Sequence, residues 1–179
     1  VDEDGRITIP HFYDDVEEVP VAEREMIAQI PFNEKKYMEA IGVKQLKGEK
    51  GYSTLERNSC RPSFDVCGIW GGYTGEGSKT VLPSKAYAKV SCRLVPHQNH
   101  ETISKLFIDY INGIAPDYVQ VKVTPMHGGE GYVCPITLPA YQAAEKGFAK
   151  AFSKKPLAVR RGGSIPIISD FEQILGIKT

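Results

Sequence analysis

Two runs of alternating residues flank a glycine-rich loop, and this pattern constrains the fold more than any other feature of the chain. In the first run, residues 63–70, four positions share one face: Phe64, Val66, Gly68 and Trp70. In the second run, residues 85–94, five apolar or small side chains share one face: Ala86, Ala88, Val90, Cys92 and Leu94. Alternation with a period of two is typical of strands that bury one face. The sequence therefore predicts an antiparallel pair of strands with a long connection between them.

The connection is rich in glycine. Five glycines occur from Gly68 to Gly77, with Thr74 between them and Ser78 directly after. Glycine adopts positive φ without the steric cost that other residues meet. We therefore expect either a sharply turning loop or a loop whose backbone a ligand can approach closely.

The rest of the chain predicts helices and two further strands. Helical spacing of apolar residues predicts helices at residues 21–30, 33–40, 100–114, 138–152 and 167–175. Asn99 is a good N-cap for the third of these helices, and Pro139 suits the first turn of the fourth. Shorter strand-like runs occur at residues 118–123 and 157–160. The order strand, loop, strand, helix, strand is most of a split β-α-β arrangement.

This order predicts the α+β class, with an antiparallel sheet that carries helices on one face, as in ferredoxin-like folds. The arrangement is incomplete at its N-terminal end, because the opening strand and helix would precede Val1. The first residues, VDEDGRITIP, are acidic and do not resemble a signal peptide, and the chain lacks an initiator methionine. We expect both ends to be cuts through a longer protein.

Charge and hydropathy argue against two classes of partner. Lys and Arg number 22 and Asp and Glu number 22, so no net charge attracts the chain to nucleic acid. No apolar run approaches the roughly 20 residues that a membrane-spanning helix needs. We expect neither a nucleic-acid nor a membrane partner.

The cysteines indicate the compartment. Cys60, Cys67, Cys92 and Cys134 contain no C-x-x-C pair, and a small secreted domain normally has a denser disulfide framework. We expect four reduced structural thiols in an intracellular, cytoplasmic protein.

Common catalytic and metal motifs are missing. His97 and His100 are three residues apart but stand without the pattern H-E-x-x-H, which favours solvated turn histidines over metal ligands. Ser164 in RGGSIP does not match the nucleophile elbow G-x-S-x-G. The stretch GEGSKT does not meet the spacing of a phosphate-binding P-loop.

A set of anion and carbonyl binders remains: Thr80, Arg93, His127 and the turn at residues 161–164. A guanidinium forms planar, bidentate bonds to a carboxylate, which Lys cannot. The pattern alone leaves two interpretations of Arg93 open, a solvated surface charge or an anion clamp.

Three blocks together resemble a known family. They are GIWGGYTGEGSKTVLPSKAYAKVSCRLVP, then MHGGEGY, then RRGGSIPI followed by an apolar helix. Their order and spacing are similar to those of the carnosinase-like dipeptidases, in the zinc aminoacylase/carboxypeptidase superfamily of metallopeptidases. The resemblance covers nearly the whole chain and is specific as a set, although each block alone is weak.

In that family a catalytic domain holds two metal ions, usually zinc or manganese, and an inserted lid domain forms the homodimer. The resemblance implies a lid insertion at residues 1–61, the lid or dimerisation domain at 62–134, and at 135–179 a helical and strand segment of the second, catalytic α/β domain. The metal ligands match nothing here and should lie outside this chain. The fragment alone is therefore expected to be inactive, because it cannot generate the attacking hydroxide.

The resemblance also implies roles in binding a dipeptide. Arg93 of R-L-V-P would clamp the C-terminal carboxylate of the substrate, and Thr80 would reach the active site of the partner subunit. His127 and Ser164 would also contact substrate. No catalytic residue and no metal ligand is expected in this fragment.

Two alternatives remain open. The chain could serve chiefly as a dimerisation or binding module without catalysis, or the parent could be an aminoacylase or carboxypeptidase of the same superfamily. Arg93 indicates only a substrate with a carboxylate and does not choose among these.

Overall fold

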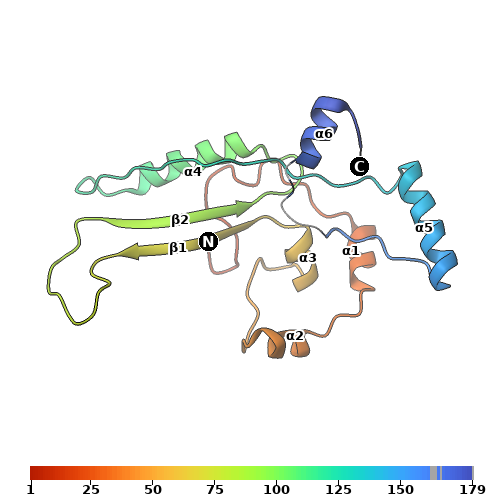
Figure 1. The fold of residues 1–179 in the computed structure, drawn as a ribbon, viewed down its shortest axis with the longest axis horizontal. Helices are drawn as coiled ribbons and strands as arrows, with labels where there is room; N and C mark the ends of the chain where they lie inside the picture. The colour runs from red at the N-terminus through yellow and green to blue at the C-terminus, as the bar shows by residue number, and fades with distance from the viewer. Residues whose placement is uncertain (162–164, 166, 179) are drawn as a thin grey trace.

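The computed structural model describes residues 1–161, 165 and 167–178. In these residues it has six helices and one two-stranded sheet (Figure 1). The elements in chain order are α1 (Val21–Ala28), α2 (Glu34–Ile41), α3 (Thr54–Ser59), β1 (Ser63–Gly71), β2 (Ala86–Arg93), α4 (His100–Ile114), α5 (Pro139–Phe152) and α6 (Ile167–Leu175). The α+β class is confirmed, and so is the antiparallel pairing of the two strands.

A β-bulge at Cys67 shifts the register of the hairpin. Val66 lies opposite Val90, but Gly68 lies opposite Lys89, so Cys67 has no cross-strand partner. An extra residue reverses which face each later side chain takes. The expectation that Trp70 shares a face with Phe64 and Val66 was therefore wrong. Trp70 instead stacks on its cross-strand partner Tyr87, with ring centroids 5.2 Å apart.

Helix α4 covers one face of the sheet near the base of the hairpin, which is the end where β1 begins and β2 ends. Asn99 caps this helix as predicted, and its side chain accepts a hydrogen bond from the Thr102 backbone N–H at 2.9 Å. The Phe64 and Phe107 rings meet 6.0 Å apart between β1 and α4. Apolar burial under α4 therefore holds the base of the hairpin.

Residues of the N-terminal segment form part of this core. Ile7, Ile9 and Phe12 are buried together with Ile103 of α4. A second, smaller cluster of Val19, Ile27 and Cys60 joins α1 to α3. The first cluster thus supports the base of the hairpin, while the far half of the hairpin is exposed.

Local sequence explains the helix limits. Asn33 caps α2, which ends at Gly42 in the left-handed conformation with φ 73°. Ser53 and Glu56 form a capping box at the start of α3, a helix that the apolar spacing did not predict because it has only six residues. No described helix has the length and apolarity that crossing a bilayer requires.

Two predicted strands are absent from the described residues. Residues 118 and 119 lie in a turn closed by a hydrogen bond from the Val119 N–H to the Pro116 carbonyl, whereas 120–123 and 157–160 pair with no strand, and Tyr118 is 89% exposed. Alternating polar and apolar residues indicate a segment that can form a strand, but the strand forms only where a neighbouring backbone offers hydrogen bonds. Both strand predictions were wrong for this structure, and the sheet has two strands where the split β-α-β pattern needs more.

Candidate functional site

Thr80 lies in the exposed loop that joins β1 to β2, residues 72–85. The Tyr73 hydroxyl donates a hydrogen bond to the Glu76 carbonyl at 2.9 Å, and the Lys79 ammonium lies 5.6 Å from the centre of the Tyr73 ring. Gly77 has a φ of 81°, which explains why glycine stands there. Contacts of Tyr73 therefore order the loop beside Thr80, and Thr80 itself is exposed.

Arg93 is the last residue of β2 and lies opposite Ser63, the first residue of β1. By strand alternation it shares a face with Ser91, Lys89 and Tyr87, the face turned away from α4. It is solvent-exposed. The position is suited to a guanidinium that meets a carboxylate arriving at the base of the hairpin.

His127 is exposed in the extended segment after α4. The next residue, Gly128, packs so closely that a Cβ there would lie 2.6 Å from the His100 ring, and one at Gly131 would lie 2.8 Å from the Val95 backbone. Glycine is required where backbone approaches this closely. These contacts place the His127 segment against the start of α4, at the same end of the hairpin as Arg93.

Glu130 secures the same segment on both sides. Its carboxylate accepts a hydrogen bond from Asn99 at 2.7 Å and another from Gln173 of α6 at 2.6 Å. The segment is thereby joined both to the cap of α4 and to the last helix.

The structure brings together some of the expected residues and separates others. Arg93 and His127 lie towards the base of the hairpin, whereas Thr80 lies in the loop at its opposite end (Figure 1). Ser164 lies outside the described residues, so its expected role stays a prediction. Within one chain Thr80 does not meet Arg93, which is the separation expected if Thr80 serves a different subunit.

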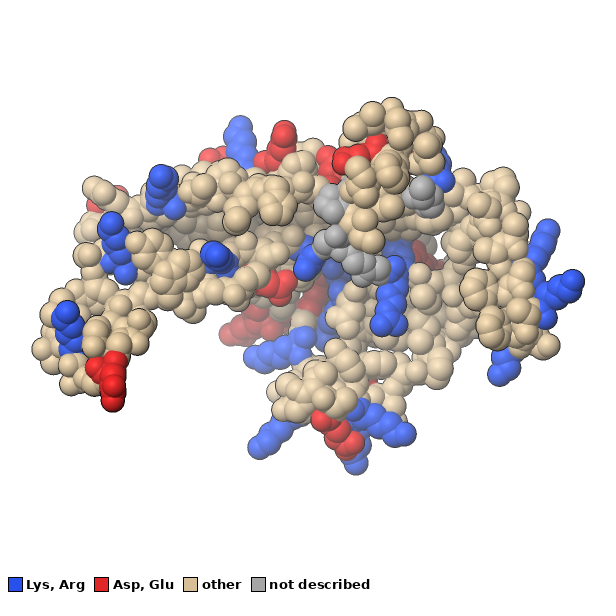
Figure 2. Space-filling view, viewed as in Figure 1, with Lys and Arg blue, Asp and Glu red and all other residues tan. Residues whose placement is uncertain are grey.

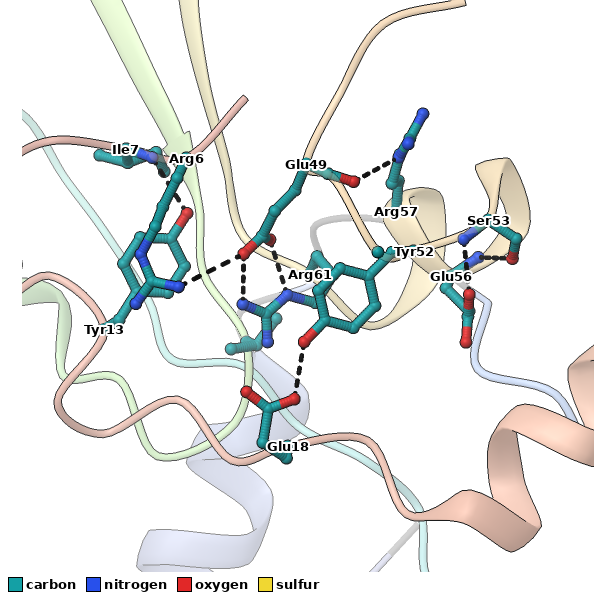
Figure 3. A network of polar contacts seen from close by, with 12 residues as sticks. Arg6, Ile7, Tyr13, Glu18, Glu49, Tyr52, Ser53, Glu56, Arg57 and Arg61 are labelled. Atoms are coloured by element: carbon teal, nitrogen blue, oxygen red, sulfur yellow. Dashed lines mark hydrogen bonds and ion pairs between the residues drawn. The ribbon is translucent and has the colours of Figure 1, made fainter. Parts of the chain in front are cut away.

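A buried polar network lies beside the base of the hairpin, and sequence reasoning missed it (Figure 3). Arg61 donates from Nε to Glu49 Oε2 and from Nη2 to Glu49 Oε1, both at 2.7 Å. Tyr52 and Tyr13 flank the Arg61 guanidinium, with ring centroids 4.4 and 5.5 Å away. Burial lowers the pKa of Arg61, but the hydrogen bonds that Arg61 donates to Glu49 and the nearby negative charge together outweigh burial, and the pKa is raised.

Two further tyrosine contacts complete the network. Tyr52 donates a hydrogen bond to Glu18 at 2.6 Å, and burial together with this bond raises the pKa of Tyr52 to about 12. The Tyr13 hydroxyl accepts a hydrogen bond from the Ile7 backbone N–H at 3.1 Å. The two segments that supply the cluster, residues 13–18 and 49–61, are far apart in the sequence, so no spacing pattern signals it.

A second ion pair adjoins the network at α3. Glu56 pairs with Arg24 and also accepts a hydrogen bond from the Ser53 backbone N–H at 2.6 Å. Burial would raise the pKa of Glu56, but the bonds from Arg24 and Ser53 outweigh it, and the pKa is lowered. This carboxylate therefore stays charged at neutral pH and ties α1 to α3.

The remaining charge is dispersed. Figure 2 shows positive and negative side chains interspersed over the visible face, without one continuous patch of either sign. Among residues 1–161, 165 and 167–178, no group of three or more His, Cys, Asp or Glu side chains is arranged to hold a metal ion. A metal centre does not fit the donor set of this part of the chain.

Comparison with known families gives one match over residues 17–119, to the peptidase dimerisation domain. The match spans β1, the loop with Thr80, β2 with Arg93, and α4.

Curated relatives extend the similarity over almost the whole chain. The Cys-Gly metallodipeptidase dug1 of Schizosaccharomyces pombe is 29% identical over 174 residues, which cover 96% of this chain and 37% of that protein. The Beta-Ala-His dipeptidase of Homo sapiens is 28% identical over 180 residues, 98% of this chain and 35% of that protein. The chain thus spans little more than a third of the length of these relatives.

Solved structures show the same fold. A metallo-carboxypeptidase of the M20 family from Sulfolobus solfataricus matches with a TM-score of 0.84 and 28% identity, over 99% of this chain and 40% of that one. Human carnosine dipeptidase 1 matches with a TM-score of 0.80 and 26% identity, over 98% and 38% of the two chains.

Proposed function

The chain belongs to the peptidase dimerisation domain family, and we propose that it is the dimerising and substrate-contacting part of a metal-dependent dipeptidase. The curated relatives named above are a Cys-Gly metallodipeptidase and a Beta-Ala-His dipeptidase, and the similarity to them extends beyond the family match to nearly the whole chain. We propose a homodimer that acts on a dipeptide or a related small carboxylate substrate.

The single observation that carries the proposal is the placement of Arg93. It ends β2 on the face away from α4, at the same end of the hairpin as His127. An exposed guanidinium held on a strand is suited to bidentate recognition of the C-terminal carboxylate of a dipeptide. Thr80, His127 and Ser164 are proposed as further substrate contacts, with Thr80 acting in the active site of the partner subunit.

The metal-dependent chemistry belongs to the rest of the full-length protein in this proposal. Two divalent ions, zinc or manganese, would be held there, because the described residues of this chain offer no suitable group. The division into residues 1–61, 62–134 and 135–179 is proposed on the same basis. The four free thiols support a reducing, cytoplasmic location.

The experiment compares substrates in the full-length, metal-loaded protein. We expect hydrolysis of dipeptides with a free C-terminal carboxylate, much weaker hydrolysis of the matching dipeptide amides, and no turnover by residues 1–179 alone with zinc or manganese. Turnover by the isolated chain at rates like those of the full-length protein would contradict the proposal.

A second candidate is a carboxypeptidase or aminoacylase, favoured by the structural match to a metallo-carboxypeptidase. Faster hydrolysis of longer peptides or of N-acyl amino acids than of dipeptides would support it. A full-length protein that dimerises but hydrolyses none of these substrates would be a non-catalytic binding module.

A further inference from the structure

We propose that the buried Glu49–Arg61 pair is a positioning element for Arg93, so that selectivity for a substrate carboxylate depends on two residues that do not touch substrate. This inference rests on the proposed function of Arg93 as the carboxylate clamp. It assigns a role to a cluster that the proposed function leaves unused.

Arg61 is held more rigidly than a surface arginine. Its side chain is 3% exposed and that of Glu49 is 9% exposed, and two parallel hydrogen bonds of 2.7 Å join them. Rings of Tyr52 and Tyr13 lie beside the guanidinium, and Arg6 approaches Glu49 at 3.9 Å. A bidentate pair between aromatic rings has little rotational freedom.

Net stability alone does not account for the pair. Desolvation offsets much of the attraction between buried charges, so apolar residues of similar volume often serve a fold equally well. Arg61 Nη1 is also buried without a hydrogen-bond partner among the described residues. A defined geometry at this position is the property that an apolar pair would not supply.

The backbone carries this geometry to Arg93 in two steps. Arg61 is followed by the buried Pro62, whose ring restricts φ, and then by Ser63, which lies directly opposite Arg93 in the sheet. A shift of the Arg61 side chain is therefore expected to move Ser63, and with it the position of Arg93 on the neighbouring strand.

Tyr13, which lies beside Arg61, also links the polar cluster to the apolar core that supports β2. It packs against the same buried core as Phe64 of β1 and as Cys92 and Leu94, the two neighbours of Arg93. At the far end of the hairpin Trp70 and Tyr87 are exposed. The contacts of Arg61 and Tyr13 therefore restrain the hairpin at its base, where Arg93 lies.

The test uses the full-length, metal-loaded protein with Glu49→Gln, Arg61→Lys and the control Asp4→Asn. Asp4 pairs with Lys50 at 3.2 Å, but both side chains are largely exposed, at 63% and 78%. Each variant is assayed on a dipeptide and on its C-terminal amide, at a temperature where thermal unfolding shows it to be folded. Arg61→Lys keeps the charge and is the milder change should Glu49→Gln unfold.

We expect KM for the dipeptide to rise about tenfold in both variants, because small displacements of a positioning group have large effects, with kcat within about twofold. Neither variant should change kcat/KM for the amide by more than about twofold, and Asp4→Asn should change nothing. Equal losses on both substrates would show a purely structural role and overturn the inference.

Arg93→Lys distinguishes failure of the positioning role from failure of the proposed carboxylate clamp. If it removes the preference for the carboxylate while Glu49→Gln and Arg61→Lys keep it, the positioning role is wrong and the proposed function stands. If Arg93→Lys itself leaves the preference intact, the proposed clamp is wrong and the positioning role falls with it.

Discussion

Arg61 and Glu49 meet in a bidentate pair, with both donor–acceptor distances at 2.7 Å and both side chains nearly enclosed by protein. Removing one partner leaves the other charge buried and uncompensated, which costs about 3 kcal/mol. We expect Glu49→Gln to lower the free energy of unfolding by about this amount, as measured by urea denaturation.

A double variant that removes both charges of the pair tests whether the loss of stability comes from the charge left unpaired. Glu49→Leu combined with Arg61→Met removes both charges, and we expect it to be more stable than Glu49→Gln. A double variant that is less stable than either single variant would show that the pair contributes large net stability.

The lowered pKa of Glu56 predicts an acid-sensitive link between α1 and α3. A carboxyl whose folded pKa lies below its unfolded value contributes stability that is present above the unfolded value, here 4.5, and is lost as the pH falls through the folded pKa. We expect the stability difference between the unmodified chain and Glu56→Gln to be largest near pH 7 and to shrink below pH 4.5. A difference that stays constant or grows on acidification would contradict this assignment.

The four thiols should react at very different rates. Cys67 is exposed at the bulge, whereas Cys60 is 2% exposed and burial raises the pKa of Cys92 to about 11. Only about one Cys92 thiol in a thousand would then be a thiolate at pH 8, so alkylation should start at Cys67. Mass spectrometry of the alkylated chain checks this order, with Cys67→Ser as the control that should lose the fast phase. Fast labelling of Cys92 in the folded chain would show that the base of the hairpin is open.

The bulge can be tested through the single tryptophan of the chain. Trp70 stacks on Tyr87 at an interplanar angle of 11°, which covers one side of the indole. We expect Tyr87→Ala to increase acrylamide quenching of Trp70 fluorescence, while Tyr118→Ala, at a residue 89% exposed, leaves it unchanged. Unchanged quenching in Tyr87→Ala would place the two rings on opposite faces, as regular alternation without a bulge predicts.

Local patterns predicted the elements that depend on local physics. The cap at Asn99, the proline at the start of α5 and the bounds of α6 all follow from propensity and spacing within one segment. The hairpin followed from alternation, but the bulge at Cys67 did not, because one extra residue leaves the sequence pattern almost unchanged.

Features that join distant segments could not be predicted in this way. Glu49 and Arg61 are twelve residues apart, and Tyr13 comes from yet another segment, so their meeting depends on the tertiary fold. For residues 118–123 the strand pattern is present, but pairing depends on a neighbouring backbone that the described residues do not supply. The candidate contacts Thr80, Arg93 and His127 came from family motifs rather than from chemistry visible in the pattern, and their roles stay predictions.

The central claim is that the chain dimerises and presents Thr80 to the site that the Arg93 of the other subunit serves. Complementation between two inactive full-length variants, Thr80→Ala and Arg93→Ala, tests it most directly. A hybrid dimer would contain one site with both residues intact and one site that lacks both.

Each variant alone should lose about 100-fold in kcat/KM on a dipeptide, the usual effect of removing one preorganised contact. Subunits mixed in equal amounts and reassociated should recover about one quarter of the activity of the unmodified protein, because half of the dimers are hybrids with one intact site each. A mixture that stays as inactive as its two components would contradict the account, since Thr80 and Arg93 would then serve the same subunit or no common site.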